Sequence, residues 1–525
     1  MSHLKTAMIS ALLGATALTA SPVVAKDLRI ALQSDADVLD PDQSRTFVGR
    51  IVYTSLCDKL VDITPNLDII PQLATEWTTS EDGTAITMQL REGVVFHDGT
   101  PFNAEAVAAN IERSQTLDES RRKSELASIT STEVTGEYEI VLNLAGPDAT
   151  LMAQLADRAG MMVSPTAAAE AGADFGLNPV CSGPFKFEER VAQDKIVLSK
   201  FDDYWNADEI HFDSVTFLPI PDTTVRLANL QSGDIDMIER LAATDLPQAR
   251  AAENIVVDSA VSLGYQGITF NINNGEKGDN PWGNDKRLRQ ALSHAIDREA
   301  LNQVVFDGAF AAGNQPFPSS SPWYNQSLPI EGADMEKAKA LLAEAGYPDG
   351  ISLEVQVPNS TEPLAVMQVV QAMAAEAGID ISLTSKEFAT LLADQSAGDY
   401  TASQIGWSGR VDPDGNNHQF VTTDGGINDS KFSDPKVDEL MNAARVASTT
   451  EERKALYDEA MVIMLDELPR LFLYHQTWIW AYNDALKGFT PYPDGMSVWK
   501  ASPGKSDLAV PALPTGRRGV LNRGA

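Results

Sequence analysis

The chain has 525 residues, a formal net charge of −34, and 43% hydrophobic and 7% aromatic residues. Such a length allows about two to four domains with buried cores, and the composition is that of a folded protein, not a disordered one. So acidic a surface repels phosphate backbones and anionic membrane faces, which argues against nucleic acid and lipid as partners.

The first 25 residues differ from everything after them. Lys5 precedes an apolar run over residues 7–20, and Ser21, Pro22 and the sequence VVA at residues 23–25 follow it. This pattern predicts a secretory signal peptide that is cleaved after about Ala25. The run is shorter than the roughly 18 to 20 apolar residues that a membrane span requires. No cysteine lies near the cleavage point, so we expect a periplasmic protein without a lipid anchor.

The first block of the mature chain mixes strands and helices. Residues 28–32 alternate like a strand and lead into a polar loop at residues 34–37. Asp82-Gly83 and Asp98-Gly99 predict tight turns beside short strands, and Asn103 is a helix cap before residues 104–114. Further elements follow in α/β order: strands at residues 134–144, 186–188, 196–198, 235–238 and 265–272, and helices at residues 51–60, 151–158 and 223–232.

A second block starts near residue 271 and alternates strands with helices. Asp285 caps a predicted long amphipathic helix over residues 286–305. The later elements are helices at residues 335–345, 364–377, 388–395, 435–446 and 451–465, and strands at residues 351–357 and 379–383. This order predicts a parallel, doubly wound sheet, in which ligands lie beyond the carboxyl ends of the strands. The apolar run at residues 471–482 is expected to return the chain to the first block.

One such strand end carries the residues most suited to a ligand site. The sequence YTASQIGWSGRVDPDGNNHQF, residues 400–420, predicts a strand that ends in a turn-rich loop. Small residues, a flat aromatic face and opposite charges two positions apart suit the wall of a small-molecule cleft. These residues are Gly406, Trp407, Gly409, Arg410 and Asp412. An ordinary strand-to-loop exit with a core tryptophan would have the same pattern.

Five stretches together resemble one family of proteins. The longest is LATEWTTSEDGTAITMQLREGVVFHDGTPFNAEAV at residues 73–107. The others are SGPFKF at 182–187, RLRQALSHAIDREAL at 287–301, AKALLAEAGYPDG at 338–350 and GWSGRVDP at 406–413. All five resemble stretches of one family, the peptide, dipeptide, oligopeptide and nickel-binding solute-binding proteins of ABC importers, known as family 5. They also occur along the chain in the same order as in that family. The stretches span nearly the whole mature chain.

This resemblance implies an α/β, two-lobed periplasmic-binding-protein fold of type II with an extra inserted domain. Each hinged lobe is then built on a mixed or parallel sheet. The implied parts are lobe I at residues 26–57, 181–270 and 482–525, an inserted domain at 58–180, and lobe II at 271–481. The implied function is capture of a short peptide or amino-acid conjugate by lobe closure, followed by delivery to the membrane permease. The implied protein is a monomer without a cofactor.

The resemblance also places individual residues near the solute. Gly406, Trp407 and Ser408 match a segment that runs beside the ligand in peptide-binding members. Arg410 stands where those members have the aspartate that holds a peptide amino terminus, so either Asp412 takes the amine or the solute presents a carboxylate to Arg410. The other implied wall residues are Asp35, Ala36, Phe47, Tyr265 and Phe388. Tyr265 and Phe388 could equally be core residues, and Asp35 could simply be solvated.

Two ligand-binding residues of the family are absent from this chain. Basic side chains that take ligand carboxylates in some members correspond here to Gln395 and Gln404.

The exported part has two cysteines, Cys57 and Cys181. An oxidising compartment permits one disulfide between them, although the sequence does not show whether they come within reach.

Other classes of function fit the sequence less well. Gly406-Trp407-Ser408-Gly409-Arg410 has arginine where a nucleophile elbow needs its second glycine, and no metalloprotease or phosphate-loop motif occurs, so we expect no enzyme. A nickel or metal-chelate carrier is the alternative within the family, yet no two histidines stand at ligand spacing. The exported histidines are His97, His211, His294, His418 and His475. A signalling solute receptor is a further alternative.

Overall fold

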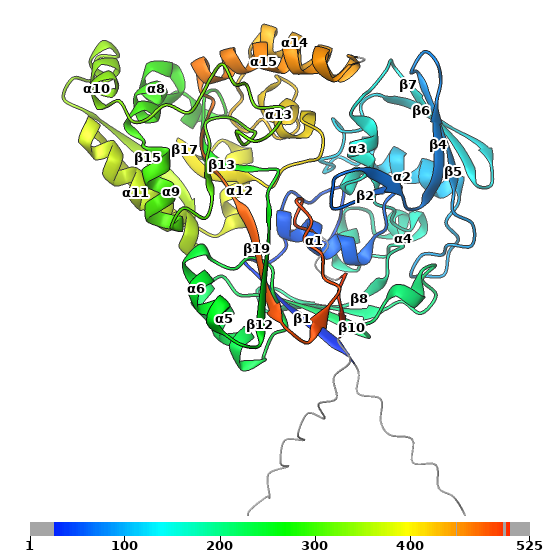
Figure 1. Ribbon diagram of the computed structural model, residues 1–525. Helices are drawn as coiled ribbons and strands as arrows, with labels where there is room; N and C mark the ends of the chain where they lie inside the picture. The colour runs from blue at the N-terminus through cyan, green and yellow to red at the C-terminus, as the bar shows by residue number, and fades with distance from the viewer. Residues whose placement is uncertain (1–25, 448, 497–499, 504–525) are drawn as a thin grey trace, which may run out of the picture.

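The computed structural model describes residues 26–447, 449–496 and 500–503. The described chain forms three α/β parts, with lobe II at the upper left, the inserted domain at the right and lobe I below them in Figure 1. The expected signal peptide, residues 1–25, lies outside the described residues. None of the helices in the described part combines the length and the apolar character that crossing a bilayer requires.

Lobe I is built on a seven-stranded mixed sheet. Across the sheet the strands are β12 (Ile255–Val261), β19 (Thr477–Asn483), β11 (Met237–Ile238), β1 (Asp27–Leu32), β10 (Ser214–Pro219), β9 (Lys195–Lys200) and β8 (Phe185–Val191). The three strands β1, β10 and β11 run parallel to one another. Its helices include α1 (Phe47–Leu56), α5 (Thr223–Ser232) and α6 (Leu246–Ala251). As the sequence predicts, α5 ends at Gly233, whose φ of 82° is the left-handed conformation that glycine tolerates.

Lobe II is built on a six-stranded mixed sheet. In order the strands are β14 (Ala311–Ala312), β18 (Arg470–His475), β13 (Tyr265–Phe270), β17 (Ala402–Trp407), β15 (Ile351–Pro358) and β16 (Ile379–Lys386). Its helices are α7 (Pro281–Asn284), α8 (Lys286–Ala295), α9 (Arg298–Phe306), α10 (Met335–Glu344), α11 (Thr361–Ala377), α12 (Phe388–Ala397), α13 (Asp414–Val421), α14 (Pro435–Val446) and α15 (Thr450–Glu467). The expected wholly parallel sheet is therefore wrong in part, because β13 and β14 run against the other strands.

The predicted helix over residues 286–305 is two helices. Helix α8 ends at Ala295 and α9 begins at Arg298. The break occurs because the Asp297 side chain accepts a hydrogen bond from the Ala300 backbone N–H and so caps a new helix. The periodicity of apolar residues continues across the break, which is why the sequence pattern predicts one element.

The inserted domain has its own four-stranded antiparallel sheet and core. The strands, in order, are β4 (Ala74–Thr79), β5 (Ala85–Leu90), β7 (Glu139–Leu144) and β6 (Ile129–Gly136), with helices α2 (Ala104–Thr116), α3 (Leu151–Leu155) and α4 (Pro165–Ala171). Two short ribbons complete the described part, β2 (Val61–Ile63) with β3 (Ile69–Pro71) and β20 (Leu486–Lys487) with β21 (Ser502–Pro503). The expected boundary at residue 180 needs correction, because Met161, Val163 and Phe175 pack into the core of lobe I.

A disulfide closes the neck of the inserted domain. Cys57 follows α1, Cys181 precedes β8, and the two are bonded with their Cα atoms 4.8 Å apart. Both side chains are buried in the core of lobe I. The bond therefore ties together the points where the chain leaves lobe I and returns to it.

The chain crosses between the two large sheets in two places. Strand β12 belongs to lobe I and β13 to lobe II, while β18 belongs to lobe II and β19 to lobe I. The crossings therefore lie at residues 262–264 and at Gln476, and the expected boundaries after residues 270 and 481 are wrong by one strand each. Both boundary strands are mostly apolar, so hydrophobicity alone does not assign them to a sheet. At the first crossing a Cβ on Gly264 would lie 1.8 Å from the Trp407 carbonyl oxygen.

His475 makes the hinge region sensitive to acid. Its buried ring bonds the Gly264 carbonyl oxygen through Nδ1 at 2.7 Å, and burial lowers the pKa of His475 to about 4. The unfolded chain has a histidine pKa of about 6.5, so this contribution to stability is complete above that pH and is lost as the pH falls towards 4.

Replacing His475 with glutamine keeps a side-chain donor and removes the titration. Between pH 7 and pH 4 we expect the variant to lose less unfolding free energy than the wild type, by an amount on the order of 3 kcal/mol. Urea unfolding at a series of pH values measures this difference. The same change at the exposed His211 is the control and should leave the wild-type pH dependence intact. Equal pH dependence in the wild type and His475→Gln would contradict the prediction.

Candidate functional site

A cavity of about 190 Å³ lies between the two lobes. It is reached by the carboxyl ends of the parallel strands of both sheets. Lobe I contributes residues that directly follow β1, β10 and β11, and lobe II contributes residues at or just beyond the ends of β15, β16, β17 and β18. The cavity therefore lies beyond the carboxyl ends of the parallel strands, which is where the strand order predicts a ligand site.

The wall from lobe I combines aromatic rings with arginines. Phe47 and Trp478 stack with ring centroids 4.7 Å apart, and the Arg240 guanidinium lies 4.4 Å from the Trp478 ring. Arg240 also donates a hydrogen bond to Gln33. Arg226, on α5, donates to the carbonyl oxygens of Ile220, Pro221 and Arg240. Arg240 Nε also forms a long ion pair with the buried Glu239, at 3.6 Å, whereas Arg226 has no ion pair within the described part of the chain.

The end of β17 forms the facing wall in lobe II. Gly406, Trp407 and Ser408 all line the cavity, as does Phe388 at the start of α12. The Trp407 indole N–H donates to Asn416, and its ring packs edge-on against Phe420 with centroids 4.8 Å apart. A rigid aromatic surface therefore stands opposite the Phe47 and Trp478 stack.

Lobe II also brings polar groups to the cavity. Glu362, on α11, accepts hydrogen bonds from Gln476 and from the Tyr474 hydroxyl. The buried Gln395 Nε2 and Gln404 Oε1 atoms have no hydrogen-bond partner within the described part of the chain. Both glutamines line the cavity. Buried amide atoms usually have partners, so a solute that bonds them would remove a cost of about 1 to 3 kcal/mol per group.

Direct contacts join the two lobes around the cavity. Arg45 of lobe I forms an ion pair with Asp429 of lobe II at 2.6 Å and donates a hydrogen bond to Ser396. Arg50, on α1, donates to the Ser408 hydroxyl at 3.0 Å. The lobes are therefore closed against each other, and opening them breaks charged hydrogen bonds.

Arg410 and Asp412 are turned away from the cavity. Neither lines it, because each is engaged by a buried partner of opposite charge. The Arg410 guanidinium pairs with Asp157 of the inserted domain and lies 4.0 Å from the Trp407 ring. Asp412 accepts two hydrogen bonds from Arg453, at 2.7 and 2.9 Å. The expectation that one of these two groups anchors the solute is therefore corrected.

The loop expected after Trp407 contains a buried helix. Residues 414–421 form α13, because Asp414 pairs with Arg445 of α14 and Asn416 bonds both Trp407 and the Arg410 backbone. Turn-forming residues in this segment thus serve a packed helix whose partners lie far away in the chain. The signal in the sequence is local and favours a turn.

Four other expected wall residues lie behind the cavity surface. Asp35 pairs with Arg190, and Ala36 is buried beside it. Gln33 and Ser34, one or two positions earlier, line the cavity instead. Tyr265 packs against Phe420 and Phe472 in a core cluster, and Gly409 lies against Leu263 and Gly264. Of the expected residues, Phe47, Phe388, Gly406, Trp407 and Ser408 line the cavity.

The sequence pattern did not lead us to predict the charged residues that line the cavity. They are Arg45, Arg226, Arg240, Glu362, Glu387, Asp429 and Arg470. A usable signal existed for Arg240 and Glu362, since each stands shortly after a predicted strand whose carboxyl end should face a ligand. No histidine or cysteine lines the cavity, and the described residues contain no cluster of three or more histidine, cysteine or acidic side chains that could hold a metal ion.

Comparison with known proteins agrees with this architecture. The model of the bacterial extracellular solute-binding proteins, family 5, matches residues 68–429, which is well over half of the chain. The glutathione-binding protein GsiB of Salmonella typhi is 30% identical over 500 residues, covering 91% of this chain and 95% of the relative.

Solved structures of similar proteins share the fold along almost the whole chain. The periplasmic binding protein DppA of Helicobacter pylori, in complex with the peptide STSA, has a TM-score of 0.83 and 26% identity, covering 91% of this chain and 98% of that one. The binding protein AgaA of A. tumefaciens R10, in complex with agropinic acid, has a TM-score of 0.83 and 25% identity, covering 91% and 99%. With its two lobes, inserted domain and interlobe cavity, the chain belongs to family 5 of the bacterial extracellular solute-binding proteins.

Proposed function

We propose that this protein captures a short peptide or a peptide-like amino-acid conjugate between its lobes and delivers it to the permease of an ABC importer. The observation that carries the proposal is the cavity, whose walls come from both lobes. Similarity to proteins named for glutathione and for bound peptide supports this class of solute. Such a solute favours closure by binding the closed form more tightly than the open form.

We assign the solute's carboxylate to Arg240 and Arg226. The Nε atoms of both arginines lack a hydrogen-bond acceptor among the described residues, and both side chains line the cavity. A guanidinium group matches a carboxylate through paired N–H donors. A carboxylate-bearing solute is thus retained from the sequence expectation, with Arg240 and Arg226 in place of Arg410.

We assign the solute's ammonium group to Glu362. This carboxylate lines the cavity, accepts only neutral donors, and has no ion pair within the described part of the chain. The aromatic rings of Phe47, Phe388 and Trp407 then cover the apolar parts of the solute, and the backbone from Gly406 to Ser408 lies beside it.

The remaining parts of the proposal rest on the family and on the sequence of the first 25 residues. The protein acts as a monomer, performs no chemistry on its solute and needs no cofactor. It is exported after cleavage near Ala25 and is free of a lipid anchor. Its partners are the solute and the permease subunits in the membrane.

Native mass spectrometry of protein purified from its exported location is the first test. We expect a discrete adduct with the mass of a short peptide or amino-acid conjugate, and we expect it to leave on mild unfolding. An adduct that leaves on chelation and carries the isotope pattern of a metal would overturn the proposal. If the purified protein is bare, glutathione and a panel of di- and tripeptides should include a ligand that raises the melting temperature. Failure of the whole panel would count against a peptide-like solute.

A chemical change in the solute tests the charge assignments. Amidation of a bound peptide's carboxylate removes the negative charge that faces Arg240. We expect a loss of affinity of about 1.5 to 3 kcal/mol, because hydrogen bonds to charged groups contribute that much. Titration calorimetry with the free acid and the amide measures the loss. In Arg240→Gln only Arg226 remains to face the carboxylate, so the preference for the acid should shrink, and an undiminished preference there would reject the assignment to Arg240.

Trp407 should be important for solute affinity. In Trp407→Ala the cavity loses its aromatic wall in lobe II, and we expect the affinity to fall by about 2 to 4 kcal/mol, the range found for buried aromatic contacts. Trp323 is the matched control, because it packs on Tyr457 in the same lobe and does not line the cavity. Trp323→Ala should therefore leave the affinity of the folded protein unchanged. Equal losses in both variants would contradict the role of Trp407.

A further inference from the structure

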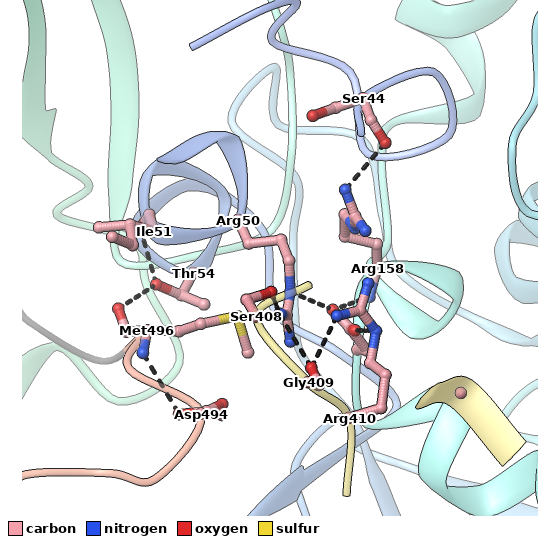
Figure 2. A network of polar contacts seen from close by, with 12 residues as sticks. Ser44, Arg50, Ile51, Thr54, Arg158, Ser408, Gly409, Arg410, Asp494 and Met496 are labelled. Atoms are coloured by element: carbon pink, nitrogen blue, oxygen red, sulfur yellow. Dashed lines mark hydrogen bonds and ion pairs between the residues drawn. The ribbon is translucent and has the colours of Figure 1, made fainter. Parts of the chain in front are cut away.

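Four arginines from all three parts of the molecule meet at a buried cluster outside the solute cavity. Arg50 comes from lobe I, Arg122 and Arg158 from the inserted domain, and Arg410 from lobe II. Arg50 and Arg410 both pair with Asp157, and Figure 2 shows the Arg158 guanidinium turned toward Ser44 beside them. The Ser44 carbonyl oxygen accepts hydrogen bonds from Arg158 at 2.8 Å and from Arg122 at 3.3 Å, so the fourth guanidinium joins the same group.

The cluster contains too few acidic groups to neutralise it. Asp157 is shared between Arg50 and Arg410, and Glu125 pairs with Arg122. The next carboxyl group near Arg50 is Asp494, and burial raises the pKa of Asp494, which favours its neutral form. Four guanidinium groups therefore share two paired carboxylates, those of Asp157 and Glu125.

Several N–H donors in the cluster have no acceptor. Arg158 has no hydrogen-bond partner for Nε or Nη2, Arg410 has none for Nη2, and Arg122 has none for Nε, within the described part of the chain. The exposed fractions of these three side chains are 1%, 6% and 0%. Burial, reinforced by Arg122, also lowers the pKa of Arg158 to about 9. An uncompensated buried charge costs several kcal/mol, so a missing negative partner is expected on physical grounds.

We propose that this arginine cluster is a buried binding site for chloride. A small monovalent anion supplies the missing negative charge and accepts several N–H donors at once without requiring a directional fit. Chloride suits a site this deeply buried better than a larger oxyanion, which needs room for three or four oxygens. The site is separate from the solute cavity, because none of the four arginines lines that cavity.

The origin of Arg410 couples this site to lobe closure. Arg410 lies in lobe II, whereas Arg122 and Arg158 lie in the inserted domain, so the complete anion site exists only when the lobes meet. Chloride then favours the closed form and tightens solute binding by linkage. This coupling rests on the proposed capture of a solute by closure, but the anion site itself does not.

A chloride titration at constant ionic strength tests the site. Sodium gluconate is exchanged stepwise for sodium chloride, and the melting temperature of the full mature chain is recorded. We expect a saturable rise of about 2 to 4 °C for a site that becomes fully occupied. Identical melting temperatures in chloride and gluconate would overturn the proposal.

Arginine variants separate the site from general salt effects. Arg158→Gln should abolish the chloride response, and Arg410→Gln is the second variant if Arg158→Gln does not fold. Arg298→Gln is the control, because Arg298 is equally buried but donates to Ser293 and the Phe472 carbonyl. The control should keep the wild-type response. A response that survives Arg158→Gln or Arg410→Gln would overturn the assignment.

Bromide gives a direct readout of position in the wild type. Crystals grown in sodium bromide should show an anomalous peak in contact with the guanidinium groups of Arg158 and Arg410. Peaks found only on the protein surface would reject the site and indicate an adventitious ion only. If the protein binds peptide but shows no chloride response, the anion site is refuted and the proposed function stands. If it shows the chloride response but binds no peptide, the anion site stands and the proposed function is refuted.

Discussion

Replacing both Cys57 and Cys181 with alanine is expected to lower the free energy of unfolding by about 5 kcal/mol. The bond joins residues 124 positions apart, and the entropy of closing so long a loop in the unfolded chain gives roughly that value. Since the loop contains the whole inserted domain, its loss frees the neck between that domain and lobe I. Urea unfolding of the oxidised wild type and the double variant measures the difference.

A reductant is the control for the disulfide prediction. It should destabilise the wild type to about the level of the double variant and leave the variant unchanged. The solute affinity of the folded variant should stay within a few-fold of the wild type, because neither cysteine lines the cavity. If the double variant loses less than about 1 kcal/mol of stability, removing the disulfide does not give the unfolded chain the conformational entropy that the loop length predicts.

Replacing Asp157 with alanine should be nearly as damaging. Asp157 bonds Arg50 of lobe I at 3.0 Å and pairs with Arg410 of lobe II, and its side chain is buried. Although burial opposes ionisation, Arg410 and Arg50 hold the pKa of Asp157 below its usual range, so the carboxylate is charged. Removing one member of a buried ion pair costs about 3 to 5 kcal/mol, because the other charges remain without compensation.

Two readouts distinguish Asp157 from a purely local ion pair. Chemical unfolding should show the stability loss, and titration with solute should show weaker binding, because Asp157 holds Arg50 and Arg410 together across the closed lobes. Glu189→Ala is the control, since Glu189 pairs with Lys195 at the surface and should cost less than about 1 kcal/mol. An Asp157→Ala protein as stable as Glu189→Ala would show that the arginine cluster does not need this carboxylate.

Local elements were predictable where the cause is local. Helix α5 ends at Gly233 because only glycine readily takes the left-handed conformation there, and Asn103 caps α2 through a hydrogen bond to the Ala106 backbone N–H. The strand β17 and its position at a sheet's carboxyl edge also follow from the pattern of apolar residues. These features depend on neighbours within a few positions.

The assignment of strands to sheets was harder to predict from the sequence. Residues 471–482 form one apolar run in the sequence, yet β18 joins lobe II and β19 joins lobe I. Both strands are largely apolar and buried, so hydrophobicity does not tell which sheet each of them joins. The position of Gln476 between the two strands becomes meaningful only when their partners, β13 and β12, are known.

The sequence by itself determined the family, the α/β class and the presence of Trp407 at a strand end that reaches the cavity. The family follows from five stretches that resemble its members, and the α/β class follows from the order of predicted strands and helices. Only the tertiary structure decided which charges line the interlobe cavity. Arg410 and Asp412 looked available, but Asp157 and Arg453 neutralise them, whereas Arg240 and Glu362 lie in the cavity. The sign of a charge is local, but its availability depends on partners that folding brings from distant parts of the chain.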